Sequence, residues 1–186
     1  MLGSSLPTAW VDELGVLGDR AYALKDMDTG TVASAKHPRR WPQLLSCEAE
    51  YQTKPKPETP LPSVSIRLPT GEVVQGCGPA TDTMLSGFFG SNVSLETAPS
   101  GELLRETDRT PAHRDVDGEI VETEPMGLGA PEGRYHDCGP IHILTTATLR
   151  TLAAHNANAS FDRVRFRPNL LIDVDGDGFP ENQWMG

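Results

Sequence analysis

Three arginines alternate with other residues near the end of the sequence, at Arg163, Arg165 and Arg167, and Asn169 continues the alternation. A β-strand would point these side chains to one side, where three guanidinium groups repel one another unless an anion or carboxylates neutralise them. Guanidinium groups bind phosphate through paired donors, and an asparagine amide offers a donor and an acceptor to a heterocycle edge. Two interpretations are therefore equally favoured: a pocket for an anionic ligand, or pairing with the chain's own Asp and Glu.

A second basic cluster contains Lys36, Arg39 and Arg40. The whole chain is nevertheless acidic, with 16 Lys and Arg against 26 Asp and Glu and a formal net charge of -10. That balance repels a phosphate backbone at long range, so we expect no nucleic-acid partner. Any anion must be bound in a local pocket, and on spacing alone solvated basic side chains are favoured over such a pocket.

The segment Asp173-Val174-Asp175-Gly176-Asp177-Gly178 matches the first half of a calcium-binding EF-hand loop. The second half does not match, because position 12, where a bidentate Glu completes the oxygen cage, is Trp184. An Asp/Gly turn after a strand is the favoured interpretation, and calcium binding at 173–178 stays as a weak alternative.

The three cysteines, Cys47, Cys77 and Cys138, are widely spaced and form no CxxC pair, which predicts reduced thiols rather than disulfides or a zinc site. His136 and Asp137 precede Cys138, but a loop is a more common setting for such neighbours than a catalytic dyad. The first residues show no secretion signal, and the chain has no run of 18 apolar residues. We therefore expect a cytoplasmic protein without a membrane partner.

Alternating apolar and polar residues predict two hairpins in the first half of the chain. The first joins 19–25 to 31–35, and the second joins 63–68 to 73–74. The stretch 51–62 between them contains four prolines, which predicts a connecting loop.

Helical spacing predicts a helix that Thr81 caps and Gly90 ends. A second helix is expected to open at Thr145 or Thr146 and to run through His155. The apolar residues 170–172 predict a strand after it.

The 18 glycines and 16 prolines have no period and favour many short elements over a helix bundle. The predicted fold is therefore mainly β with a few short helices, or α+β in looser terms. The polar, acidic residues 99–134 are interpreted as a linker between an N-terminal β-rich lobe, 1–98, and a second lobe, 135–186.

Several segments, taken together and in order, resemble the MOSC family, named after the C-terminal part of molybdenum cofactor sulfurases and found in amidoxime-reducing components. The most specific is Phe166-Arg167-Pro168-Asn169-Leu170. The others are 15–24 and 32–42, similar to the family's first hairpin, 137–149, similar to the entry into its second lobe, and 181–186.

The resemblance implies a β-barrel MOSC core, a smaller β-rich N-terminal lobe, and the pyranopterin molybdenum cofactor as ligand. Basic side chains would neutralise the phosphate and the dithiolene of the cofactor, while Asn169 and the Asp137-Cys138 turn orient its pterin. The cofactor-binding residues implied in this way are Arg20, Ser34, Lys36, Asp137, Cys138, Arg165, Arg167 and Asn169.

The chain departs from the family pattern in two places. The strand with a Lys-Ser pair that opens family members has no counterpart before Met1, and the cysteine that ligates molybdenum has none after Gly186. We therefore expect a chain truncated at both ends, whose unpaired barrel edges favour homo-oligomers. No catalytic or metal-ligating residue is assigned.

The resemblance leaves several functions open. Intact relatives act as molybdenum-dependent reductases of N-hydroxylated compounds or as sulfur carriers in cofactor maturation, which would imply an electron-transfer partner or a pyridoxal-phosphate sulfurase. The alternative is a non-catalytic module that binds the pterin or completes itself with a partner's strand.

Overall fold

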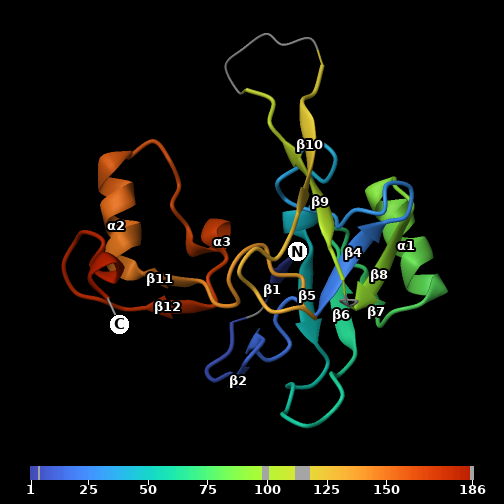
Figure 1. Ribbon diagram of the computed structural model, residues 1–186, viewed down its shortest axis with the longest axis horizontal. Helices are drawn as coiled ribbons and strands as arrows, with labels where there is room; N and C mark the ends of the chain where they lie inside the picture. Colours follow the sequence, from blue (N-terminus) through green and yellow to red (C-terminus); the bar gives the residue numbers. More distant parts are fainter. Residues whose placement is uncertain (4, 98–100, 112–117, 185–186) are drawn as a thin grey trace. The chain divides into compact units, whose positions relative to one another are not determined.

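A computed structural model describes residues 1–3, 5–97, 101–111 and 118–184. The chain divides into two compact units, Met1–Pro140 and Ile141–Gly186, named unit 1 and unit 2 below (Figure 1). Each unit is built from short strands and helices, which confirms the mixed, strand-rich character expected from the sequence. No closed barrel is present among the described strands.

The first sheet of unit 1 has four strands in the order β1-β5-β6-β7. Their bounds are Leu2–Gly3, Glu48–Tyr51, Val64–Arg67 and Val73–Gln75. β1 runs parallel to β5, and the other neighbours are antiparallel. The β6-β7 hairpin confirms the second predicted hairpin. Its alternation buries Val64 and Ile66 and leaves Arg67 exposed.

A second group of strands joins two antiparallel pairs. β4 (Tyr22–Asp26) pairs with β8 (Val93–Thr97), and β9 (Leu104–Asp108) pairs with β10 (Val121–Pro125). Val32 links the pairs, because it bridges to Lys25 on one side and to Arg105 on the other. The returning strand that was predicted over 31–35 is reduced to this bridge.

The β9-β10 hairpin lies within the segment that was interpreted as a linker, 99–134. Its residues form strands because their carboxylates are neutralised across the hairpin. Arg109 forms ion pairs with Glu122 and Glu124. The two compact units divide after Pro140. Residues 104–108 and 121–125, which were expected to belong to an acidic loop or linker, form strands instead.

Helix α1 (Pro79–Phe89) packs against β8 and β7 (Figure 1). It ends at Gly90, which has the left-handed conformation (φ 66°) that was expected of the residue after a helix. It begins at Pro79 rather than after a Thr81 cap, because proline is favoured in the first helical turn. The core of unit 1 lies between this helix and the sheets and includes Leu24, Trp41, Cys47, Val64, Ile66, Leu85, Val93 and Leu95.

Unit 1 also contains three short elements. β2 (Val11–Asp12) pairs antiparallel with β3 (Gly15–Val16), and η1 is a 3-10 turn at Leu44–Ser46.

Unit 2 has the parallel pair β11 (Ile143–Thr145) and β12 (Leu170–Ile172), with helices α2 (Thr146–His155) and α3 (Arg163–Phe166) between them in sequence. A 3-10 turn, η2 (Pro180–Gln183), follows. The predicted helix and the predicted strand at 170–172 are both confirmed. Thr145 caps α2, since its hydroxyl accepts a hydrogen bond from the backbone N–H of Thr148 at 3.0 Å.

Helix α3 contradicts the predicted strand at 163–167. Residues two apart in a helix are about 200° apart around its axis, so Arg163 and Arg165 do not share a face. The side chain of Asp162 caps this turn by accepting from the N–H of Val164 at 2.9 Å, and Arg167 ends it in the left-handed conformation (φ 52°). The Asp162 cap and the left-handed Arg167 therefore favour a helical turn over the strand that the alternation predicted. None of the helices described is long and apolar enough to cross a lipid bilayer.

Candidate functional site

Lys36 is held in a tight turn that follows the Val32 bridge. Its backbone N–H donates to the hydroxyl of Ser34 at 3.2 Å, and the carbonyl of Ser34 accepts from the N–H of His37 at 3.1 Å. The carbonyl of Lys36 accepts from the N–H of Asp108 at 2.8 Å, which fixes the turn to the end of β9. Ser34 thus shapes the turn through its hydroxyl and its carbonyl.

The Asp137 carboxylate forms ion pairs with two basic side chains from distant parts of the chain. Lys36 Nζ lies 2.9 Å from Asp137 Oδ2 and 3.2 Å from Oδ1, and Arg105 Nη1 donates to Oδ1. Arg105 also donates from Nη2 to Glu124 Oε2 at 3.0 Å. Two of the predicted site residues, Lys36 and Asp137, are therefore brought together although they are 101 positions apart. We call Lys36, Arg105, Glu124 and Asp137 the Asp137 cluster.

Arg105 is the residue of this cluster that sequence reasoning missed. It is only 6% exposed, and its Nε has no hydrogen-bond partner among the described residues. A buried guanidinium with an unpaired N–H is costly, because the group has lost its water without full replacement. Residues 104–108 contain one apolar side chain, Leu104, so they show no apolar alternation, and the acidic, Pro- and Gly-rich surroundings favoured a loop.

The hydroxyl of Thr107 also donates to Glu124 Oε2, at 3.2 Å. Desolvation acts to raise the pKa of Glu124, but the hydrogen bonds and positive charges of Arg109, followed by the hydrogen bond from Arg105, outweigh it and lower the pKa. Glu124 is therefore an anion that joins two guanidinium groups at neutral pH.

The segment that carries Asp137 is anchored along residues 14–20. The backbone N–H of Tyr135 donates to the carbonyl of Arg20 at 2.8 Å, and Arg134 Nη1 donates to the carbonyl of Val16 at 2.9 Å. The ring of His136 is fully buried, with Nε2 2.9 Å from the carbonyl oxygen of Leu14. These contacts fix the start of the Asp137-Cys138 turn.

Arg20 takes part in this arrangement through its backbone. It adopts the left-handed conformation (φ 50°), and its guanidinium lies 3.8 Å from the carboxylate of the neighbouring Asp19. Cys138, next to Asp137, is an exposed thiol. Unit 1 therefore contains five of the predicted residues: Arg20, Ser34, Lys36, Asp137 and Cys138.

The other three predicted residues belong to unit 2. Asn169 Oδ1 accepts from the backbone N–H of His142 at 2.8 Å, and the N–H of Asn169 donates to the carbonyl of His142 at 2.8 Å. Arg165 Nη1 donates to the carbonyl of Ser160 at 2.6 Å, and Arg167 ends α3. Asn169 and Arg165 thus both make local contacts that hold the chain around α3 and β12. The cofactor-binding roles that the resemblance implies for Arg165, Arg167 and Asn169 stay predictions.

The 173–178 loop is tied to α2. Arg150 Nη2 donates to the carbonyls of Val174 and Gly176, the latter at 2.6 Å, and Thr146 Oγ1 donates to Asp173 Oδ1 at 2.7 Å. The Arg150 guanidinium is therefore hydrogen-bonded to two carbonyl oxygens of this turn, those of Val174 and Gly176. In the part of the chain that the structure describes, no three His, Cys, Asp or Glu side chains group as metal ligands.

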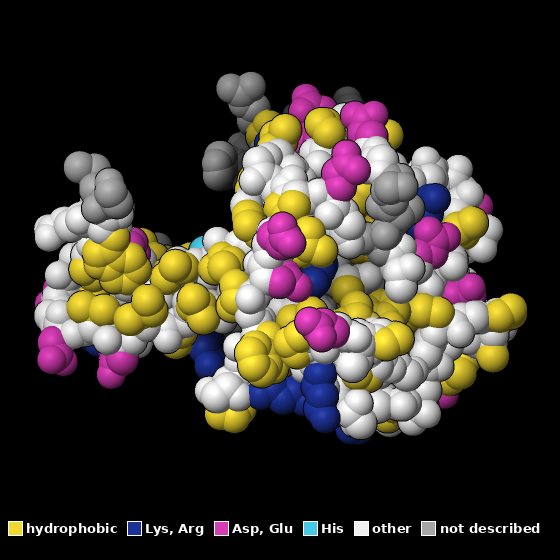
Figure 2. Space-filling model, turned by 60° about the horizontal axis from the view of Figure 1, so that its bottom comes forward, with side chains coloured by type: hydrophobic (Ala, Val, Ile, Leu, Met, Phe, Trp, Pro, Cys, Tyr) yellow, Lys and Arg dark blue, Asp and Glu magenta, His cyan; other side chains and the backbone are white. Residues whose placement is uncertain are grey.

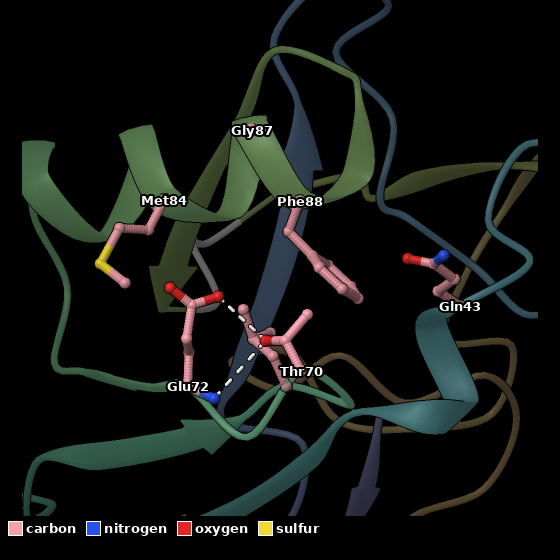
Figure 3. A pocket seen from close by; sticks show the side chains of 7 residues that line it. Gln43, Thr70, Glu72, Met84, Gly87 and Phe88 are labelled. Atoms are coloured by element: carbon pink, nitrogen blue, oxygen red, sulfur yellow. Dashed lines mark hydrogen bonds between the residues drawn. The ribbon is translucent and has the colours of Figure 1, made fainter.

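A shallow groove in unit 1 lies between α1 and the β6-β7 turn (Figure 3). Met84 and Phe88 come from the helix, and the hydroxyl of Thr70 donates to Glu72 Oε2 at 2.9 Å across the turn. None of the predicted cofactor-binding residues lines it. The Asp137 cluster, rather than this groove, is therefore the candidate functional site.

Comparison of the chain with models of protein families, with curated proteins and with solved structures finds no match.

Proposed function

We propose that the chain is a MOSC-type protein that binds the pyranopterin molybdenum cofactor. One observation carries the proposal: Lys36 and Asp137, assigned to the cofactor by resemblance alone, meet in one cluster with a buried arginine. Two cations on one carboxylate, beside an exposed thiol at Cys138, make a site where an anionic group can be exchanged.

The phosphate of the cofactor fits the chemistry of this cluster. The Lys36 and Asp137 side chains are 43% and 44% exposed, and ion pairs at such exposure contribute only about 0 to 1 kcal/mol. A phosphate can therefore replace the Asp137 carboxylate at Lys36 at little cost, and at the buried Arg105 it would supply the anion that the carboxylate supplies now. The unpaired Nε of Arg105 is a further donor within the same side chain. Arg165, Arg167 and Asn169, in unit 2, stay in the proposal as cofactor-binding residues that the resemblance implies.

The residues do not fit the metal as well as they fit the pterin. None of Cys47, Cys77 and Cys138 stands at the position of the family's molybdenum-ligating cysteine. Cys47 is buried in the core, and burial raises the pKa of its thiol. The proposal is therefore cofactor binding, with no redox step assigned to this chain, and a pterin carrier without catalysis is the second candidate. A MOSC-type barrel, a cytoplasmic location and an electron-transfer or sulfurase partner belong to the proposal as its finer expectations.

The test is to purify the chain from a host that makes the cofactor. Bound pterin is measured by fluorescence after oxidation, and molybdenum by mass spectrometry. Lys36→Gln removes one charge-assisted contact and is expected to lower the pterin content about tenfold. Lys56→Gln is the matched control, because Lys56 is an exposed lysine of the 51–62 loop.

The proposal fails if wild-type protein carries no pterin, or if Lys36→Gln and Lys56→Gln retain it equally. Pterin without molybdenum would favour the carrier over a reductase.

A further inference from the structure

Two Asp-Gly pairs follow each other in the loop after β12, at Asp175-Gly176 and Asp177-Gly178. Aspartate isomerises readily before glycine, because glycine has no side chain to hinder its backbone nitrogen or to restrict its backbone. That nitrogen attacks Cγ of the preceding aspartate. The two pairs offer the same chemistry in an unfolded chain, so a difference between them in the folded protein must come from the structure.

The peptide group between Asp175 and Gly176 is open to this reaction. Both residues are exposed, and Figure 2 shows acidic side chains at the surface of unit 2. Among the described residues, neither the Asp175 carboxylate nor the N–H of Gly176 has a hydrogen-bond or ion-pair partner. Arg150 Nη2 binds the carbonyls of Val174 and Gly176, one on each side. The loop is therefore anchored around this peptide group but not at it.

The peptide group between Asp177 and Gly178 is held by helix α2. The N–H of Gly178 donates to Thr151 Oγ1 at 2.6 Å, and the same hydroxyl donates to the carbonyl of Gly178 at 3.3 Å. The Asp177 carboxylate lies 3.7 Å from Arg150 Nε. The Gly178 nitrogen must leave the Thr151 hydroxyl before it can attack Asp177, so the reaction there requires local opening of the loop.

We propose that Asp175 is a modification site at which the folded protein forms isoaspartate, and that Thr151 protects Asp177 from the same change. In the first step the Gly176 nitrogen bonds to Cγ of the Asp175 carboxylic acid. The hydroxyl of the acid leaves with the proton of the nitrogen as water, and a succinimide ring closes.

The second step adds water to one of the two ring carbonyls. Breaking the bond between the Gly176 nitrogen and Cγ restores aspartate. Breaking the bond between that nitrogen and the backbone carbonyl carbon gives isoaspartate, in which the backbone runs through the side chain. One water leaves and one returns, so the mass is unchanged and neither an oxidant nor a cofactor is needed. The proposal does not depend on cofactor binding.

Isoaspartate at position 175 should also loosen the loop. It adds one methylene to the backbone between the carbonyls of Val174 and Gly176, which the Arg150 guanidinium now binds together. The altered spacing opposes simultaneous binding of both carbonyls. The amides of 174–178 should therefore exchange faster with solvent in the modified protein than in the unmodified one.

The test incubates the folded full chain at neutral pH and locates isoaspartate by peptide mapping with electron-transfer mass spectrometry. Isoaspartate should accumulate about two- to tenfold faster at Asp175 than at Asp177, which is the effect expected of one hydrogen bond. The same chain in urea is the control and should show similar rates at both positions. The third Asp-Gly pair of the sequence, at 117–118, lies in a separate tryptic peptide.

Two variants of Thr151 test its protective role. Thr151→Val removes the hydroxyl with little change of shape and should raise the rate at Asp177 about two- to tenfold, with the rate at Asp175 unchanged. Thr151→Ser keeps a hydroxyl and should keep Asp177 slow. A variant that fails to fold would instead reproduce the rates of the urea control at both positions, and circular dichroism identifies it independently.

Equal rates at Asp175 and Asp177 in the folded wild type would overturn the proposal. A folded Thr151→Val variant in which Asp177 stays as slow as in the wild type would overturn the role of Thr151. An Asp175 that isomerises in urea but not in the folded chain would show that the loop shields this residue too, and the modification site would be lost.

Discussion

The carboxylate of Asp26, fully buried in unit 1, is paired with the guanidinium of Arg40. Asp26 Oδ1 also accepts hydrogen bonds from the backbone N–H groups of Asp28 at 2.9 Å and Thr29 at 3.3 Å. The pair therefore fixes the turn after β4 and joins it to the segment that carries Lys36. A buried charge that keeps all of these partners is tolerated, but one that loses a partner is not.

Replacement of Asp26 by alanine is expected to lower the free energy of unfolding by about 1 to 3 kcal/mol, because Arg40 loses its nearest carboxylate and the N–H groups of Asp28 and Thr29 lose their acceptor. Urea denaturation followed by circular dichroism measures the change. Asp28→Ala is the control, since Asp28 lies exposed in the same turn, and it should cost much less. Equal losses in the two variants would show that the turn, and not the ion pair, carries the stability.

The three tyrosines are expected to resist ionisation in the folded protein. Burial raises the pKa of Tyr135 to about 12, with Glu96 and Cys77 adding to the effect, and burial also raises the pKa of Tyr22 and Tyr51. The hydroxyl of Tyr135 donates to the carbonyl of Thr97 at 3.0 Å, which requires its proton.

Ultraviolet titration should therefore show almost no tyrosinate near pH 10, whereas protein unfolded in urea should titrate there. Because the folded pKa of Tyr135 is raised, its contribution to stability is complete below pH 10 and is lost as the pH rises towards 12. A native protein that titrates like the unfolded chain would contradict the burial of these rings.

Glu181 is expected to titrate below its ordinary range. Desolvation acts to raise its pKa, but hydrogen bonds from Thr148, from the Glu181 backbone and from Thr145 outweigh it and lower the pKa. The lowered pKa means that its contribution to stability is present above the unfolded value and is lost as the pH falls through the folded one.

Carbon-detected NMR of the carboxyl group measures this titration directly. Thr148→Val removes the nearest hydroxyl with little change of shape and should bring the Glu181 pKa back towards its ordinary value. Thr151→Val is the control, because the hydroxyl of Thr151 contacts Gly178 and not Glu181. An unchanged pKa in Thr148→Val would show that these hydroxyls do not hold the carboxylate.

Replacement of Gly15 by any residue with a side chain is expected to destabilise unit 1. The φ of Gly15 is +98°, and a Cβ built on it would lie 2.5 Å from the carbonyl oxygen of Pro140. Gly15→Ala therefore combines backbone strain with a clash and should cost about 2 to 4 kcal/mol. Gly30→Ala shares the positive φ, +74°, but has open space around the added methyl, so it should cost about 1 kcal/mol. Thermal unfolding of both variants compares them, and equal losses would argue against close packing at Pro140.

The sequence was informative wherever a local rule decides the structure. The β6-β7 hairpin follows from alternation, the end of α1 at Gly90 from the left-handed preference of glycine, and the start of α2 from the Thr145 cap. In each case the residues that determine the element lie within a few positions of it.

Other elements depend on partners that are distant in sequence. The sequence of β9 and β10 is typical of an acidic loop. The two segments form strands because Arg105 and Arg109 neutralise the Glu124 carboxylate across the hairpin. The same applies to the candidate site, where Lys36 and Asp137 were assigned by resemblance but Arg105 was not. At 163–166 the alternation was real, yet the Asp162 cap selected a helical turn.

The Val32 bridge has a consequence for cooperativity in unit 1. The N–H of Val32 donates to the carbonyl of Leu104, and the next N–H, of Ala33, donates to the carbonyl of Leu24, both at 2.8 Å. Two successive peptide groups thus couple the β4-β8 and β9-β10 pairs. Local opening at these two hydrogen bonds would let the two pairs fluctuate separately. The hydrogen-exchange rates of the Val32 and Ala33 amides should therefore report whether the two pairs of unit 1 unfold together.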